Sequence, residues 1–166
     1  HGLTAGDVPG FGEPGLVLTP PDRASAEDDG LLGVSAIARL RLDADLVILS
    51  ACNTAAPDGT PGAEALSGLA RAFLYAGARS LLVSHWPVVS TAAVELTTGL
   101  VAAQQADPAI GRADALRRSQ ERALSAAPSA AAAHPLLWAP FVLVGEGGRP
   151  IAVAPAQDEP EEAAQP

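Results

Sequence analysis

Cys52 is the single cysteine of the 166-residue chain, and its neighbours suit a nucleophile. It comes three residues after the last residue of the apolar run Leu46–Leu49, which we expect to form a strand covered on both faces. A cysteine attacks a carbonyl group as the thiolate, which requires a nearby base and backbone donors for the oxyanion that forms. The sequence therefore offers either a cysteine nucleophile or a small buried thiol with a structural role.

Further polar side chains follow the two most apolar runs of the chain. Ser50 and Asn53 lie on either side of Cys52, and His85 comes directly after the second run, Arg79–Ser84. In open α/β sheets, ligands bind outside the carboxyl ends of the parallel strands. Ser50, Asn53 and His85 are therefore our candidates for a substrate cleft. For His85, a structural role without substrate contact is the alternative, because a lone histidine is more often structural.

The elements that must position these residues have an α/β pattern. Apolar residues with helical spacing predict a helix over 63–76, ended by Gly77, between the two strand-like runs. The order strand, helix, strand predicts a parallel crossover unit. We also expect a helix from Gly33 with Ser35 as N-cap and apolar residues up to Leu42, a helix from a Ser90 or Thr91 cap to about Gln105, one from Pro108 to about Leu124, and a last strand over 138–144.

Composition and charge exclude several classes of function. The formal net charge is −9, so a nucleic-acid partner is not expected. All basic residues are Arg, which indicates a compositionally biased bacterial genome. No apolar run approaches the roughly 18 residues of a membrane span, so we expect no membrane partner and a soluble protein, with the cytoplasm favoured. Three histidines without acidic partners at ligand spacing predict no metal site, and no cofactor is expected.

Six motifs follow one another along the chain: His1-Gly2, Asp29–Leu32, Ala44–Ala55, Gly68–Ser80, Ser84–Val88, and His134-Pro135 with Trp138–Gly145. In this order they resemble the CHAT family, whose members are caspase-like peptidase domains commonly found behind tetratricopeptide repeats. The resemblance runs from His1 to about Gly145. It implies a caspase-like three-layer α/β fold with a mostly parallel sheet. We expect residues 1–147 to be the C-terminal part of such a domain, incomplete at the N-terminus, and residues 148–166 to be a disordered Pro, Ala and acid-rich tail.

The resemblance also implies a chemistry. Cys52 would be the nucleophile of peptide-bond cleavage through a thioester, and His1 the base that later protonates the leaving amine. The backbone amides of Gly2 and Cys52 would be the oxyanion donors. Caspase-like relatives that cut after basic residues often carry an acid two positions before the cysteine, whereas this chain has Ser50. Many members have an apolar residue where His85 stands. The implied partners are a protein or peptide substrate and an upstream repeat or sensor region.

Three functions stay open from the sequence. The first is a cysteine endopeptidase with a Cys52–His1 dyad. The second is a catalytically inactive caspase-like module that recognises peptides or partner proteins for binding or signalling. The third is another acyl-transfer or hydrolase reaction that uses the same thiol, because a fold alone does not fix the substrate. For His134, which precedes a proline, we expect a structural role.

Overall fold

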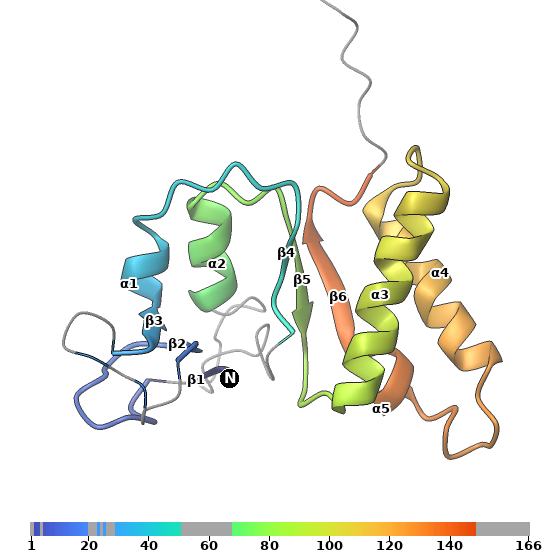
Figure 1. Cartoon of the computed structure of the whole chain (residues 1–166), viewed down its shortest axis with the longest axis horizontal. Coiled ribbons are helices and arrows are strands. Elements are labelled where there is room, and N and C mark those ends of the chain that lie inside the picture. The colour runs from blue at the N-terminus through green and yellow to red at the C-terminus, as the bar shows by residue number, and fades with distance from the viewer. Residues whose placement is uncertain are drawn as a thin grey trace, which may run out of the picture.

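The chain forms two small sheets and five helices over the described residues of a computed structural model (Figure 1). The structure describes residues 2–3, 5–19, 23, 25, 29–50 and 68–148. The strands are β1 Gly2–Leu3, β2 Gly15–Val17, β3 Leu31–Gly33, β4 Val47–Ile48, β5 Ser80–Ser84 and β6 Phe141–Gly145. The helices are α1 Val34–Ile37, α2 Gly68–Tyr75, α3 Ser90–Ala106, α4 Arg112–Ser125 and α5 Pro135–Trp138.

The strand β5 is the centre of the larger sheet, whose order is β4-β5-β6. All five of its residues are buried, as the continuous apolar run predicts for a strand covered on both faces. Leu81 and Val83 enter one core with Phe73 of α2, while Leu82 enters a second core with Leu96 of α3. Figure 1 shows α1 and α2 on one side of this sheet and α3 and α4 on the other, so the sheet lies between two layers of helices.

The parallel crossover is confirmed for β4 and β5, which pair with Val47 opposite Leu81 and Ile48 opposite Leu82. The expected mostly parallel sheet is not confirmed, because this is the one parallel pairing among the named strands of the described residues. The strand β6 runs antiparallel to β5, with Ser84 opposite Phe141. The reason is topological: the long helices α3 and α4 form a hairpin that returns the chain to the end of the sheet where β5 stops.

The smaller sheet has the order β1-β2-β3 and is antiparallel throughout. Gly2 pairs with Leu16 at its edge. Two glycines make room for the ring of Phe11: a Cβ on Gly15 would lie 3.0 Å from the ring, and one on Gly33 would lie 2.9 Å from it. The sheet that carries Gly2 is therefore held by close packing around Phe11.

Gly77 ends α2 as the sequence predicts. Its φ of +105° is a left-handed conformation that a glycine adopts without strain. The amide of Gly77 donates to the carbonyl oxygen of Leu74 at 3.0 Å, and that of Ala78 donates to the carbonyl oxygen of Phe73 at 3.1 Å. These two hydrogen bonds form a Schellman motif, which satisfies carbonyl groups at the helix end.

The start of α1 differs from the prediction, and the assignment of Ser35 as N-cap is wrong. Gly33 is the N-cap, without a side-chain hydrogen bond, and the helix ends at Ile37 instead of continuing towards Leu42. Glu13, from the loop between β1 and β2, satisfies the helix terminus instead. Its carboxylate accepts hydrogen bonds from the hydroxyl of Ser35 at 2.5 Å and from the amide of Ser35 at 3.0 Å. These bonds, together with the charge of Arg39, lower the pKa of Glu13.

Two further boundaries differ by a few residues. The N-cap of α3 is Val89, so Ser90 is the first helical residue rather than a cap. Trp138, expected in the last strand, belongs to the short helix α5, and β6 begins at Phe141. A turn of helix is favoured here because Pro135 occupies its first position, where the missing amide costs nothing. No helix of the described chain is long and apolar enough to cross a membrane.

Candidate functional site

The carboxyl ends of β4 and β5 bring the described cleft candidates to one edge of the sheet. The amide of Leu49 donates to the carbonyl oxygen of Leu82 at 2.8 Å, which carries the parallel ladder to the residue before Ser50. Ser50 is exposed at this edge. On the neighbouring strand, Ser84 is fully buried, whereas the next residue, His85, is exposed. Ser50 and His85 are thus the accessible polar residues that follow the two strands.

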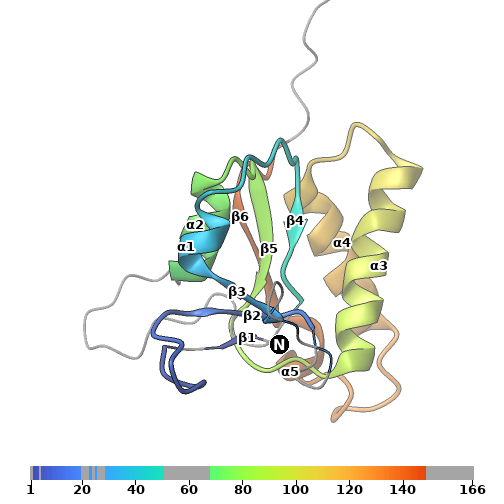
Figure 2. The ribbon, with the colours of Figure 1, turned by 60° about the vertical axis from the view of Figure 1, so that its left-hand side comes forward.

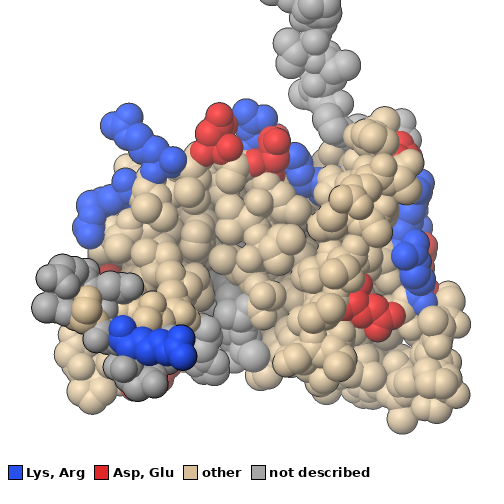
Figure 3. Space-filling view, viewed as in Figure 1, with Lys and Arg blue, Asp and Glu red and all other residues tan. Residues whose placement is uncertain are grey.

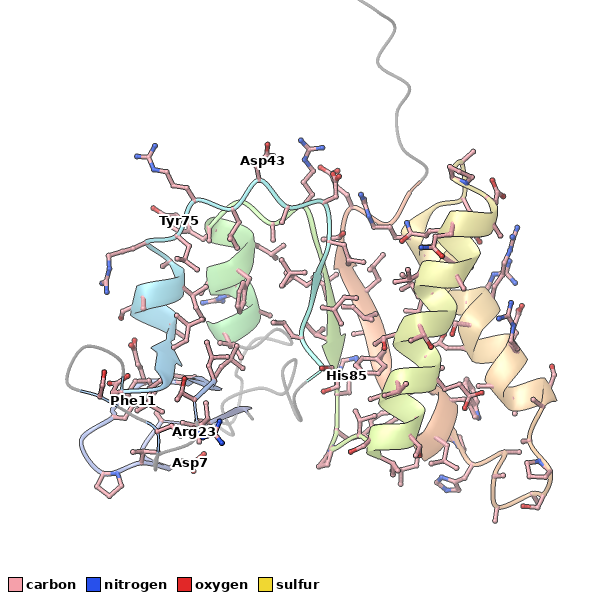
Figure 4. All side chains as sticks on the ribbon, viewed as in Figure 1. Asp7, Phe11, Arg23, Asp43, Tyr75 and His85 are labelled. Carbon is pink, nitrogen blue, oxygen red and sulfur yellow. The ribbon has the colours of Figure 1, made fainter. Side chains whose placement is uncertain are left out.

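His85 is held in place by contacts on both sides. Its backbone amide donates to the carbonyl oxygen of Pro140 at 3.0 Å, just before β6 begins. Its ring lies against that of Trp86, with ring centroids 6.3 Å apart and an interplanar angle of 32°. Figure 4 shows His85 at the lower end of β5, where the strand leaves the sheet. The position of His85 is therefore fixed by the strand, by Pro140 and by an aromatic neighbour.

Trp86 belongs to the same turn and has one polar atom. Its indole Nε1 is buried and makes no hydrogen bond in the described structure. The other tryptophan, Trp138, donates from its Nε1 to the carbonyl oxygen of Ala133 at 3.0 Å. Trp138 therefore serves as a packing and hydrogen-bonding anchor, as a tryptophan usually does.

The strand β1 lies on the side of the molecule towards which β4 and β5 point. Figures 1 and 2, which differ by a 60° rotation, both place β1 below the carboxyl ends of these two strands. Gly2 is the first residue of β1. The two sheets, although separate, thus place Gly2, Ser50 and His85 on one side of the molecule.

The predicted nucleophile and base are not among the residues that the structure describes. Cys52 and His1 lie outside the described residues, as does the cleft candidate Asn53. The geometry of the dyad and of the oxyanion donors therefore stays a prediction. The described residue next to His1 is Gly2. The last described residue before Cys52 is Ser50, two positions earlier.

Charged side chains gather at the opposite edge of the larger sheet. Asp45 lies 3.1 Å from a guanidinium nitrogen of Arg79 and 3.4 Å from one of Arg112, and Asp43 extends the cluster. Figure 3 shows basic and acidic side chains along the upper edge of the molecule, and Figure 4 shows Asp43 there. The ion pairs therefore join the elements of the fold at the edge away from the candidate site.

The remaining candidates have structural roles or no ligand set. The Nδ1 atom of His134 accepts a hydrogen bond from the amide of Leu136 at 3.2 Å and so caps α5, which confirms the structural role expected for it. Over the described residues, no three His, Cys, Asp or Glu side chains come together in a way that could hold a metal ion. Sequence reasoning missed Pro140, whose carbonyl group positions His85, because this contact joins segments far apart in the chain.

Comparisons with known proteins give a consistent result. A family model described as CHAT domain matches residues 3–146. Cys52 and His85 lie within the matched segment, and His1 and Gly2 precede it. A mouse protein, Tetratricopeptide repeat protein 28 of Mus musculus, is 31% identical over 164 residues, an alignment that covers 87% of this chain and 6% of that protein. The chain thus corresponds to a small part of this relative.

Proposed function

The chain belongs to the CHAT domain family, a family of caspase-like peptidases, and we propose that it is a cysteine endopeptidase whose catalytic dyad is Cys52 and His1. The single observation that carries this proposal is the parallel register of β4 and β5, which brings Ser50 and His85 to one edge. The carboxyl edge of parallel strands is where open α/β sheets bind their ligands. Cys52 follows Ser50 by two residues in the sequence, which supports Cys52 as the nucleophile.

The proposed reaction proceeds in two steps. His1 takes the thiol proton, the sulfur of Cys52 attacks the carbonyl carbon of the scissile peptide bond, and a tetrahedral oxyanion forms. When the carbon–nitrogen bond breaks, His1 gives its proton to the leaving amine, and the acyl group stays on Cys52 as a thioester. A water molecule that gives a proton to His1 then attacks the thioester. The acid product leaves, and the thiol recovers its proton.

Backbone amides are the natural donors for the oxyanion in this scheme. The resemblance to the CHAT family makes the amides of Gly2 and Cys52 the candidates. The side of the molecule on which Gly2 lies supports its assignment, since β1 lies below the carboxyl ends of β4 and β5 (Figure 2). A preorganised amide stabilises the developing charge without reorganising during the reaction.

The described part of the cleft gives no reason to expect a basic residue at the cleavage site. Ser50 is exposed and uncharged, and His85 is the one titratable side chain among the described residues that directly follow β4 and β5. A carboxylate at the position of Ser50 would attract a basic substrate side chain, and none is present there. We therefore propose a protein substrate cleaved after a neutral or acidic residue.

The proposed partners are the protein substrate and a repeat region that steers or activates the peptidase. The mouse relative is named for tetratricopeptide repeats, and most of its length lies outside the aligned segment. Helical repeats form extended concave surfaces that bind other proteins. A repeat region in the same polypeptide could therefore deliver substrates to the cleft or hold the peptidase inactive.

A peptide library tests the proposal through its products. The polypeptide that carries this chain is incubated with the library, and new termini are identified by mass spectrometry. We expect cleavage that Cys52→Ala and His1→Ala each abolish, while His134→Asn, which keeps a capping side chain at the start of α5, leaves it intact. Cleavage that survives Cys52→Ala would refute the peptidase. Peptide binding without turnover would identify the inactive module instead.

A further inference from the structure

The helix α3 has apolar residues on both of its faces. Its inner face contributes Leu96 and Leu100 to the core against β5, β6 and α4. On its outer face, Val94 is 61% exposed and Val101 is 41% exposed, and Glu95 is the one charged residue of the whole helix. A surface helix normally confines its apolar residues to a single stripe. The outer face of α3 therefore has the composition of a surface that a partner covers.

The neighbouring helix α4 has a different outer face. Its exposed residues are mostly charged, and Arg117 bridges Asp114 and Glu121 along the helix. These bonds raise the pKa of Arg117, chiefly through its hydrogen bond with Glu121. In Figure 3 the surface over α3 is mostly uncharged, while basic side chains lie towards α4. The surface over α3 and its border with α4 is thus mostly uncharged, in contrast to the outer face of α4.

A hollow of about 260 Å³ lies on this border. Its lining residues are Glu95, Thr98, Gly99 and Ala102 of α3 with Ser119 and Arg122 of α4. The two helices approach closely because Gly99 has no side chain: a Cβ there would overlap the Oγ atom of Ser119, which donates to the carbonyl oxygen of Leu96 at 2.9 Å. The hollow is therefore lined mainly by small, uncharged residues. Its two charged lining residues are Glu95 of α3 and Arg122 of α4.

The two charges favour a particular occupant. Glu95 comes from α3 and Arg122 from α4, and neither side chain makes an ion pair with another described residue. A second copy can face this surface after a 180° rotation about an axis that passes between the two charges, so that each charge meets the opposite charge of the other copy. Glu95 of each copy then meets Arg122 of the other copy, and the exposed valines pack against the second copy. Such a self-complementary patch is typical of a two-fold interface.

We propose that the α3–α4 face is a homodimer interface, in which a second copy of this chain lies across the hollow with reciprocal Glu95–Arg122 ion pairs. The 17 residues of α3 make it about 25 Å long, and two neighbouring helices, each about 10 Å across, offer a face of roughly 500 Å² per copy. A standard interface buries about 800 Å² per partner, so we expect a weak, transient dimer.

Sedimentation velocity on the full chain, from micromolar to millimolar concentration, measures this association. The wild type should dimerise, and Val94→Glu should weaken the dimer about tenfold or more, because it places a charge in the interface. Leu18→Glu is the matched control, because Leu18 is 65% exposed and directly follows β2 of the other sheet. Circular dichroism of every variant shows whether its fold is retained.

Charge reversal makes the test specific for the reciprocal ion pairs. Glu95→Arg and Arg122→Glu should each weaken the homodimer, because like charges then meet across the axis. The double variant should dimerise like the wild type, and an equimolar mixture of the two single variants should form a heterodimer. A monomer at all concentrations would overturn the proposal. It would also be overturned by single variants that dimerise like the wild type or by a double variant that is not rescued.

Discussion

The backbone amide of His85 donates a hydrogen bond of 3.0 Å to the carbonyl oxygen of Pro140. This contact extends the pairing of β5 and β6 by one step beyond Ser84 and Phe141. It fixes the direction in which the chain leaves the sheet at the candidate cleft. The side chain of His85 is exposed, whereas its backbone position is set by the fold.

Two substitutions of His85 separate its side chain from its backbone. His85→Leu keeps the amide, so the free energy of unfolding should change by no more than about 0.5 kcal/mol, as for an exposed side chain. His85→Pro removes the donor and should cost about 1 kcal/mol or more. Urea denaturation of the two variants measures the difference. Equal stability of both would show that the hydrogen bond to Pro140 does not contribute.

Gly33 is predicted to be intolerant of a side chain. A Cβ there would overlap the Glu13 carboxylate and would lie 2.9 Å from the ring of Phe11. Glu13 could move away only by losing its hydrogen bonds with Ser35. Gly33→Ala should therefore lower the free energy of unfolding by about 1–3 kcal/mol, the usual cost of overpacking.

The matched control for Gly33→Ala is Gly12→Ala. No atom lies within 4 Å of the Cβ position of Gly12. The midpoint denaturant concentration of the Gly12→Ala variant should equal that of the wild type. A loss of stability at Gly12 equal to that at Gly33 would mean that packing around Phe11 is not the cause.

Glu13 makes the stability of the α1 terminus depend on pH. Its pKa is lowered in the folded protein, first by the Ser35 hydroxyl, then by the Ser35 amide and by Arg39. A carboxylate with a lowered folded-state pKa stabilises the fold above its ordinary pKa, and this contribution is lost as the pH falls through the folded-state value. The stability difference between wild type and Glu13→Gln should be constant near neutral pH and should shrink below about pH 4.

Thermal unfolding between pH 3 and pH 8 measures this difference. Ser35→Ala, alone and combined with Glu13→Gln, completes a double-mutant cycle for the pair. The two substitutions should be less than additive at neutral pH, because both remove the same hydrogen bond. Strict additivity, or a difference that does not depend on pH, would contradict the role of Glu13 at the helix terminus.

Local patterns predicted the parts of the fold in which neighbouring residues decide the structure. The continuous run Leu81–Val83 predicted a strand buried on both faces, and β5 is one. Gly77 predicted the end of α2, because the left-handed turn there suits glycine. The edge formed by the carboxyl ends of β4 and β5 followed from the strand, helix, strand order, and Ser50 and His85 both lie at it.

Contacts between distant segments could not be predicted in this way. Glu13 satisfies the start of α1 from another loop, whereas the local sequence predicts Ser35 as the N-cap. The antiparallel direction of β6 depends on the α3–α4 hairpin, whose return to the same end of the sheet is a property of the whole segment. Pro140 positions His85 across the sheet. In each case the partner is far away in the sequence and has no motif of its own.

Covalent labelling of Cys52 tests the central claim most directly. Because the chain has one cysteine, an adduct with a thiol-reactive peptidyl ketone, measured by intact mass, reports on this residue alone. A Cys52–His1 dyad predicts labelling that His1→Ala slows at least about tenfold, as expected for the loss of a base, and that His134→Asn leaves unchanged. Labelling of equal rate in the wild type and His1→Ala would contradict the dyad.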